Sequence, residues 1–335
     1  MEKKIILLVC HAGSSVGLGH LSRLLALAKF LTVNNNYHVE FLIFGDDFKM
    51  EELKSYRTYQ FSMSSGFISS SKNIIEQVSP SMVIFDLYPK LLPSNLEKLK
   101  LFEWTMEKNI RLIGIDSLVA YSPFLDHVWV PSFFSNLSKK SVFRDKLTSG
   151  WDSILLQKRL PTKKWNPGVR VLILTGGSDA TGLGETLPAL LEDMLKEDTV
   201  LDWVKGPFSN HPSLPPKCKL NWNIHVSPPH LDELIVQSNY VLTVFGLSFF
   251  EVLQYGIPSV VFSPYGKKDD NEMKSLAKEG VSLVSWNSIH AVEQLVELMK
   301  NDSLAQDYSD NSLVKMSTNG VKKLSSKIQL LLGDS

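Results

Sequence analysis

The 335-residue chain has only two cysteines, Cys10 and Cys218, and they lie far apart in the sequence. Two isolated thiols provide neither a disulfide framework nor the closely spaced ligands of a zinc knuckle. A protein of a reducing compartment, most simply the cytoplasm, is therefore expected. No metal site is predicted.

The chain also lacks an excess of charge and a long apolar run. Lys+Arg and Asp+Glu both number 35, so nothing in the overall charge favours nucleic acid as a partner. The apolar run at 5–10 is too short to span a bilayer, and no clear signal-peptide cleavage site follows it before Gly13. We interpret the run as a strand. No long basic amphipathic stretch favours a membrane surface, although peripheral contact stays open.

Two common nucleotide-binding motifs are missing from the glycine-rich segment at 16–23. The dinucleotide fingerprint needs Gly or Ala three residues beyond its second glycine, where this chain has Ser22. The phosphate loop of nucleoside triphosphatases needs a lysine followed by Ser or Thr, and none closes this turn. Both absences disfavour a nicotinamide-dependent oxidoreductase and a P-loop enzyme.

What the segment does contain is a histidine and an arginine behind two glycines. Gly17 and Gly19 allow a sharp turn and close approach of a ligand, and His20 and Arg23 fall on neighbouring positions of the first helical turn. A proton acceptor, a fixed cation and a helix N-terminus would then lie together. The alternatives are a tight strand-to-helix connection and a structural histidine.

Apolar runs alternate with helical spacing along the chain, which predicts an α/β protein with parallel sheets. The length suits two domains. Strands are predicted at 5–9, 39–44, 82–85, 112–115, 128–130, 169–174, 200–204, 223–226, 240–244 and 259–262. Helices are predicted at 21–31, 96–106, 187–195, 231–237, 249–254, 271–277, 290–299 and 313–332.

The domain boundary is predicted in the proline- and lysine-rich segment 158–167, which reads as a solvated linker between domains at 1–157 and 168–335. The last helix completes the second domain or crosses back onto the first. The serine-rich stretch 62–71 is expected to be a surface loop. Parallel sheets bind ligands beyond the carboxyl ends of their strands, so the substrate is expected in a cleft between two facing domains.

Two loops of the second half suit a phosphate. Gly176, Gly177 and Ser178 follow one predicted strand and can form a nest of N–H donors. Gly246 and Leu247 follow another strand, and Ser248 can cap the next helix and donate to a phosphate oxygen. The alternative is a purely structural capping box of Ser248 with Glu251. Farther along, Asp270 and Asn271 are helix caps or contacts to a sugar.

In this order, the motifs resemble those of GT-B nucleotide-sugar enzymes. They are Gly17-x-Gly19-His20-x-x-Arg23, Gly176-Gly177-Ser178-Asp179, Gly246-x-Ser248-x-x-Glu251, Gly256-Ile257-Pro258 and Asp270-Asn271. The resemblance covers nearly the whole chain. It is strongest to the UDP-2,4-diacetamido-2,4,6-trideoxy-β-L-altropyranose hydrolase of pseudaminic acid biosynthesis and the related spore-coat polysaccharide proteins.

The resemblance implies two Rossmann-like domains of the GT-B fold and cleavage of a UDP-sugar at its anomeric carbon without a metal or other cofactor. His20 would be the general base. Substrate would also contact Gly17, Gly19, Arg23, Asp86, Tyr88, Asp116, Asp270 and Asn271. UDP would contact Gly176, Gly177, Ser178, Val226, Ser227, Gly246, Leu247, Ser248 and Glu251, with Glu251 on the ribose and Val226 and Ser227 beside the uracil.

The chain departs from this family in its first half. Asp86-Leu87-Tyr88 stands where Asp-His-Tyr is common, Asp116-Ser117 stands where an acidic pair is expected, and Val130-Pro131-Ser132 replaces an Asn-Gln-Asn segment. For Asp86, Tyr88 and Asp116, substrate contact and strand termination are both open. The departures affect the identity of the reaction more than nucleotide binding.

The leading hypothesis is a UDP-sugar hydrolase in the synthesis of a nonulosonic acid or another surface sugar. The first alternative is an inverting glycosyltransferase, in which the same base deprotonates a glycan acceptor. The second is a nucleotide-sugar-binding protein without catalysis, and a redox enzyme is a remote fourth.

Overall fold

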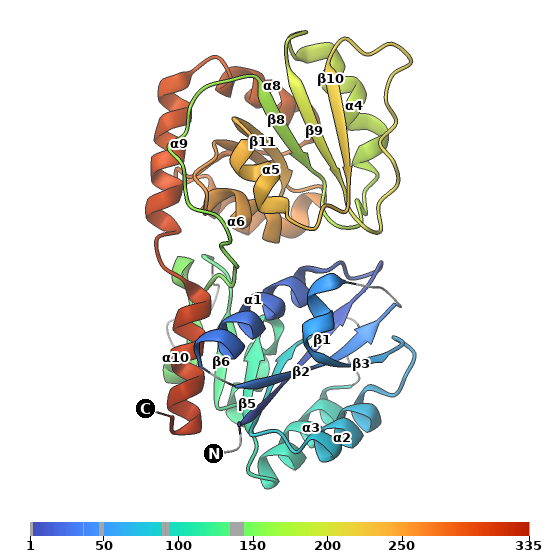
Figure 1. Ribbon diagram of the computed structural model, residues 1–335, viewed down its shortest axis with the longest axis vertical. Helices are drawn as coiled ribbons and strands as arrows, with labels where there is room; N and C mark the ends of the chain where they lie inside the picture. Colours follow the sequence, from blue (N-terminus) through green and yellow to red (C-terminus); the bar gives the residue numbers. More distant parts are fainter. Residues whose placement is uncertain are drawn as a thin grey trace. The chain divides into compact units, whose positions relative to one another are not determined.

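The computed structural model describes residues 3–35, 37–46, 50–88, 91, 94–134 and 144–334. The chain divides into two compact units, one formed by Met1–Gln157 with Thr318–Ser335 and the other by Lys158–Ser317 (Figure 1). The first segment of the first unit ends at Gln157, the residue predicted to end the first domain, but the unit also includes Thr318–Ser335.

The first unit contains a seven-stranded parallel sheet in the order β3-β2-β1-β4-β5-β6-β7. The strands are β1 (Ile5–Ala12), β2 (His38–Gly45), β3 (Arg57–Phe61), β4 (Met82–Asp86), β5 (Arg111–Ile115), β6 (His127–Val130) and β7 (Leu147–Ser149). The helices are α1 (Gly19–Asn34), α2 (Phe67–Val78), α3 (Asn95–Glu107) and α10 (Gly320–Leu332), with 3-10 segments η1 (Glu51–Ser55), η3 (Asp116–Phe124), η4 (Arg144–Lys146) and η5 (Trp151–Ser153).

Successive residues of β1 are buried on opposite faces of this sheet. Ile6 and Leu8 lie in a core with α1 and α10, whereas Leu7 and Val9 lie in a second core with α2 and α3. Burial on both faces explains why the strand reads as a continuous apolar run without alternation. The two cores also fix α1 and α2 on opposite faces, so the connections change sides between β1 and β4.

The second unit contains a six-stranded parallel sheet in the order β10-β9-β8-β11-β12-β13. Its strands are β8 (Arg170–Leu174), β9 (Val200–Lys205), β10 (Asn221–Val226), β11 (Tyr240–Val244), β12 (Ser259–Phe262) and β13 (Leu283–Ser285). Its helices are α4 (Leu183–Met194), α5 (Leu231–Gln237), α6 (Leu247–Leu253), α7 (Asp270–Leu276), α8 (Ser288–Leu298) and α9 (Asp302–Lys315), with η6 at Gly266–Asp269. Helices α4 and α8 pack on one face, and α5 and α6 on the other.

Four sequence-based expectations about the architecture need correction or completion. The stretch 62–71 is not wholly a loop, because α2 begins at Phe67. Ile74, Ile75 and Val78 recur on its buried face, and this apolar pattern outweighs the serines. The strands β3, β7 and β13 are additional to those predicted.

The segment 158–167 belongs to the second unit and is not solvated throughout. Trp165 is buried in the core of that unit, and its indole Nε1 donates to the carbonyl of Asn239 at 2.6 Å. Burying the large apolar ring outweighs the polar character of its neighbours.

The segment 313–332 is predicted either to complete the second domain or to cross back onto the first. Its first residues do the former and its later residues the latter. Helix α9 ends in the second unit, and α10 packs with α1 on the first.

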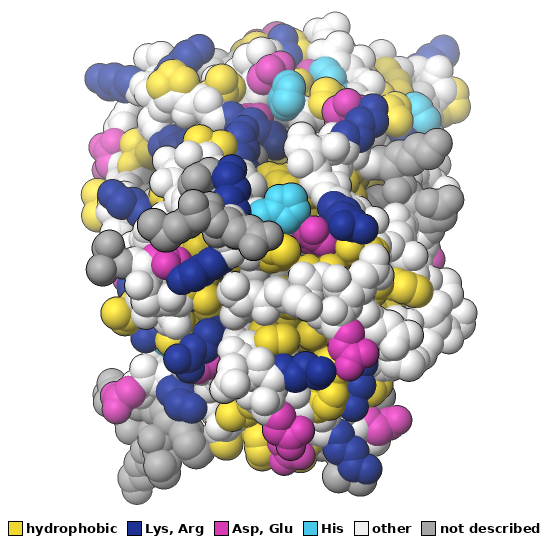
Figure 2. All heavy atoms as spheres, turned by 60° about the horizontal axis from the view of Figure 1, so that its bottom comes forward, with side chains coloured by type: hydrophobic (Ala, Val, Ile, Leu, Met, Phe, Trp, Pro, Cys, Tyr) yellow, Lys and Arg dark blue, Asp and Glu magenta, His cyan; other side chains and the backbone are white. Residues whose placement is uncertain are grey.

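The surface carries both signs of charge. Figure 2 shows basic and acidic side chains interspersed on the face that it presents, which agrees with the balanced composition. Among the helices in the described ranges, none combines the length and apolar character needed to cross a bilayer.

Candidate active site

The predicted residues of the first unit meet at the carboxyl ends of three neighbouring strands. β1 leads to the glycine turn and α1, β4 ends at Asp86, and Asp116 directly follows β5. The connections change faces between β1 and β4, and such switch points are where open parallel sheets bind ligands. The sheet order therefore brings together residues that are far apart in the chain.

The glycine turn has different requirements at its two glycines. Gly17 has φ +74° and exchanges backbone hydrogen bonds with Gly13, so a side chain there would be strained. Gly19 begins α1 without a positive φ, and a Cβ added to it would meet no atom within 4 Å. Gly17 is thus needed for the turn, while Gly19 leaves open space next to His20, as a substrate contact would require.

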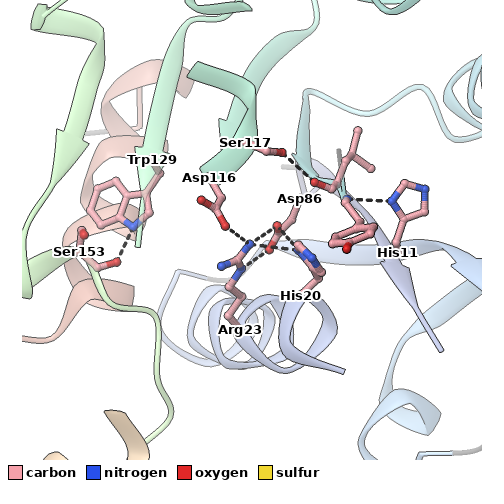
Figure 3. Close-up of polar contacts among 10 residues, drawn as sticks. His11, His20, Arg23, Asp86, Asp116, Ser117, Trp129 and Ser153 are labelled. Atoms are coloured by element: carbon pink, nitrogen blue, oxygen red, sulfur yellow. Dashed lines mark hydrogen bonds and ion pairs between the residues drawn. The ribbon is translucent and has the colours of Figure 1, made fainter. Parts of the chain in front are cut away.

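His20 and Arg23 point from the first turn of α1 toward Asp86 (Figure 3). His20 Nδ1 lies 2.7 Å from Asp86 Oδ1, and Arg23 donates to both carboxylate oxygens of Asp86. Asp86 is fully buried, whereas the side chains of His20 and Arg23 are 14% and 12% exposed. The carboxylate is the buried centre of the network, with His20 and Arg23 closer to solvent.

The charge of Asp86 sets the tautomer of His20. Burial would raise the pKa of Asp86, but Arg23 and His20 together hold it below its usual value, so the group is a carboxylate that can only accept. His20 Nδ1 must then carry the hydrogen, which leaves Nε2 free to accept a proton in the neutral ring. The 3.1 Å approach of Arg23 Nη2 to the same Nδ1 is a contact between two donors.

The contact of Asp86 with substrate stays a prediction; in this structure its side chain has no exposed surface and is bound by His20 and Arg23. Asp116 is different: its side chain is 48% exposed and accepts from Arg23 Nη2 at 3.2 Å. Burial would lower the pKa of Arg23, but the two carboxylates raise it, so Arg23 stays a cation. Tyr88 is half-buried, and its ring packs edge-on to His20 at a centroid distance of 6.3 Å.

A second histidine, His11, lies near this network, although no sequence motif indicated it. His11 lies near the end of β1, and its Nδ1 accepts from the backbone N–H of Tyr88 at 2.9 Å. Burial and the charge of His20 lower the pKa of His11 to about 4, against the opposing effect of Asp86. The one available signal was its place at the carboxyl end of the strand, two residues before Gly13.

The replaced segment Val130-Pro131-Ser132 begins at the last residue of β6. The hydroxyl of Ser132 donates to the carbonyl of Phe134 at 2.7 Å, and the carbonyl of Ser132 accepts from the Gly150 N–H at 2.9 Å. The polar groups of Ser132 thus bind neighbouring backbone at Phe134 and Gly150.

In the second unit, the two predicted phosphate loops follow adjacent strands. Gly176, Gly177 and Ser178 follow β8, and Gly246 precedes α6 after β11. A Cβ added to Gly176, whose φ is +89°, would lie 3.8 Å from Val244, the last residue of β11. The loops thus meet at the switch point of this sheet. Asp179 closes the first loop by accepting from the N–H groups of Leu183 and Gly184 at 2.9 and 2.7 Å.

The structural alternative for Ser248 and Glu251 is wrong. Helix α6 begins at Leu247 with Gly246 as its N-cap and has no side-chain cap, so Ser248 lies inside the helix and no capping box forms. Glu251 is partly buried. Burial and the nearby charge of Asp232 raise its pKa to about 7, against the lowering effect of Arg159. Among the described residues, the Glu251 carboxylate has no hydrogen-bond partner in the structure.

The remaining predicted contacts lie farther from this switch point. Val226 ends β10, the edge strand, with 58% of its surface exposed, and Ser227 follows with φ +44°. Asp270 and Asn271 open α7 beyond β12; Asp270 pairs with Lys274 at 3.9 Å, and Asn271 is exposed. These residues all lie at or after the carboxyl ends of strands of the same sheet, β10 and β12.

The described residues contain no group of three or more His, Cys, Asp or Glu side chains arranged to hold a metal ion. No protein-family model matches the chain, and no curated protein matches its sequence.

Solved structures do match, over essentially the full length. MurG from Acinetobacter baumannii is 17% identical, with a TM-score of 0.65 over 98% of this chain and 100% of MurG. A putative UDP-N-acetylglucosamine 2-epimerase from Listeria monocytogenes is 12% identical, with a TM-score of 0.63 over 100% of this chain and 98% of the epimerase. Phytolacca americana UGT2, complexed with UDP-2fluoro-glucose and pterostilbene, is 12% identical, with a TM-score of 0.66 over 98% of this chain and 100% of UGT2. The neighbours are GT-B nucleotide-sugar enzymes, and the α/β, GT-B prediction is confirmed.

Proposed function

We propose that this protein cleaves the anomeric C–O bond of a UDP-sugar, with His20 as the general base. The observation that carries the proposal is the 2.7 Å contact between His20 Nδ1 and the buried Asp86, at the switch point of the first sheet. The GT-B fold and the phosphate-compatible loops of the second unit support a nucleotide-sugar substrate.

In the proposed reaction, His20 Nε2 takes the proton of an attacking hydroxyl as its oxygen bonds to the anomeric carbon. The C–O bond to UDP breaks, and the electron pair leaves with the diphosphate. Asp86 stabilises the imidazolium that forms, as an oriented carboxylate does for a catalytic histidine. Arg23, held by Asp86 and Asp116, keeps the carboxylate ionised and in place.

UDP is assigned to the second unit. The glycine loops after β8 and β11 would bind the diphosphate through backbone N–H groups, assisted by the hydroxyls of Ser178 and Ser248. Glu251, which has no hydrogen-bond partner among the described residues, would accept from the ribose hydroxyls. Val226 and Ser227 would border the uracil, and Asp270 and Asn271 would read the sugar. No metal or other cofactor takes part.

Water is the proposed nucleophile, which makes the protein a hydrolase in the cytoplasmic synthesis of a pseudaminic-type or other surface sugar. This choice rests on the motif resemblance. The competing reaction is transfer to an acceptor hydroxyl, favoured by the match to UGT2, whose structure contains both a UDP-sugar analogue and a second organic molecule. His20 would have the same task in both.

The test measures UDP released from a panel of UDP-sugars that includes UDP-N-acetylglucosamine, with and without an added acceptor. Stoichiometric UDP and free sugar without acceptor are expected for the hydrolase. Release that depends on acceptor would establish the transferase instead. Binding of UDP by calorimetry without turnover of any sugar would leave a binding protein, and absence of UDP binding would contradict the whole proposal.

A further inference from the structure

The buried His11 holds the backbone of Tyr88, two residues after Asp86. Its Nδ1 accepts from the Tyr88 N–H at 2.9 Å, and the residue is only 2% exposed. Its ring lies 6.2 and 6.0 Å, centroid to centroid, from Phe44 and Phe67. A buried N–H without a partner destabilises the fold, so the acceptor on His11 fixes this backbone.

The chain leaving β4 is held from a second side as well. Ser117 Oγ donates to the carbonyl of Leu87 at 2.8 Å, so the residue between Asp86 and Tyr88 is also fixed (Figure 3). Leu87 is fully buried. The backbone that follows Asp86 is therefore held by His11 at Tyr88 and by Ser117 at Leu87.

We propose that His11 is a positioning residue for His20. By holding Tyr88, it orients the Asp86 carboxylate toward His20 Nδ1 and places the Tyr88 ring edge-on to the imidazole. Its catalytic consequence rests on the proposed function, whereas its effect on His20 does not depend on any substrate.

The charge state of His11 suits this role. A backbone N–H can only donate, so Nδ1 is unprotonated and the neutral ring carries its hydrogen on Nε2. With its pKa lowered to about 4 by burial, His11 stays neutral across the physiological range. A protonated ring would lose the acceptor and place a second cation beside His20.

The first unit contains a matched control in His127. It is also 2% exposed, and burial also lowers its pKa to about 4. However, it lies at the start of β6, with its Nε2 2.9 Å from the Thr148 hydroxyl on β7. His127→Phe therefore reports the cost of losing a buried histidine that does not hold Tyr88.

Two amide variants separate the hydrogen bond from the general polarity of the side chain. In His11→Asn, the amide oxygen can occupy the place of Nδ1 and accept from Tyr88. In His11→Gln, the longer side chain carries its oxygen past that place. His11→Phe removes the acceptor but keeps a ring between Phe44 and Phe67.

The experiment records long-range proton–nitrogen spectra of histidine-labelled full-length protein, in which the His20 ring reports its tautomer. Wild type, His11→Asn and His127→Phe should show His20 protonated on Nδ1. His11→Gln and His11→Phe should show loss of the single tautomer. In UDP release, these two should lower kcat by about 10-fold while the UDP Kd is unchanged, and His11→Asn should restore most of the loss.

An unaltered His20 spectrum in folded His11→Gln would overturn the proposal, as would an equal loss in His11→Asn. If His11→Phe does not fold, the comparison of His11→Asn with His11→Gln still tests the proposal. If wild type releases no UDP from any sugar, the proposed function fails, but the spectra still test what His11 does to His20.

Discussion

Each unit of the molecule contains a buried aspartate bound by a histidine and an arginine. In the first unit, Asp86 lies 2.7 Å from His20 and accepts from Arg23. In the second, Asp202 lies 2.8 Å from His225 Nε2 and 2.6 Å from Arg170 Nη1. The composition and distances are almost the same, so neither identifies a catalytic site.

The two networks differ in their place in the fold. Asp86 is the last residue of β4, next to the start of α1 at the switch point of its sheet. Asp202 lies inside β9, paired in register with Leu172 of β8 and Asn223 of β10. A carboxylate in the middle of a sheet needs partners because an unpaired buried charge is costly. We infer that the second network only stabilises the fold.

The largest expected effect separates the two histidines. His20→Ala should lower UDP release about 100- to 10,000-fold, because it removes the group that takes the proton. UDP binding, measured by calorimetry, should persist. His225→Ala should retain turnover within about 2-fold per folded molecule, since its loss affects stability alone. Equal effects on turnover would erase the distinction between the networks.

The two aspartates sharpen the comparison at a smaller scale. Asp86→Asn removes the charge that orients His20 and should lower kcat about 100-fold with little change in the UDP Kd. Asp202→Asn should leave kcat unchanged but lower the free energy of unfolding by about 3 kcal/mol in urea titrations, because Arg170 and His225 lose their anion. A kcat loss in Asp202→Asn that matched Asp86→Asn would contradict this assignment.

A third carboxylate tests which part of the second unit is functional. Glu251→Ala should weaken UDP binding about 10-fold and raise KM more than it lowers kcat, because the ribose loses an acceptor. Glu233→Ala, on the exposed side of α5, is the control and should bind UDP normally. Normal UDP binding by Glu251→Ala would remove Glu251 from the site.

The smallest expected effect is on stability against pH. The folded-state pKa of Glu251 is raised from its usual value of 4.5 to about 7, so its ionisation weakens the fold as pH rises through this range. Glu251→Gln should match wild type near pH 4.5 and exceed it by about 2 kcal/mol in unfolding free energy above pH 7. Identical pH profiles would show that Glu251 is not desolvated.

Local patterns predict what is local in this fold. The apolar runs locate ten strands, and the spacing of His20 and Arg23 puts both on the first turn of α1. The switch-point rule then indicates the carboxyl ends of the strands, where the structure places the predicted residues of both sheets. These features depend on residues close together in the chain, or on the order in which strands alternate with helices.

The rest depends on contacts between distant residues. Asp86 meets His20 only because β4 lies beside β1, and its complete burial likewise depends on the packing of elements that are distant in the chain. No motif marks His11, because the role proposed for it depends on a hydrogen bond to the backbone of Tyr88, which is distant in the chain. Ser248 fits a capping box by spacing, but the helix begins two residues earlier than that box requires. Tertiary structure decides each of these.

Chemical rescue tests His20 as the base most directly. In His20→Gly, free imidazole should restore UDP release in proportion to its concentration, and rescue should increase with pH as imidazole becomes neutral. His225→Gly should show no such dependence. A folded His20→Gly variant that binds UDP but releases it at the wild-type rate without imidazole, or that imidazole does not accelerate, would contradict the account.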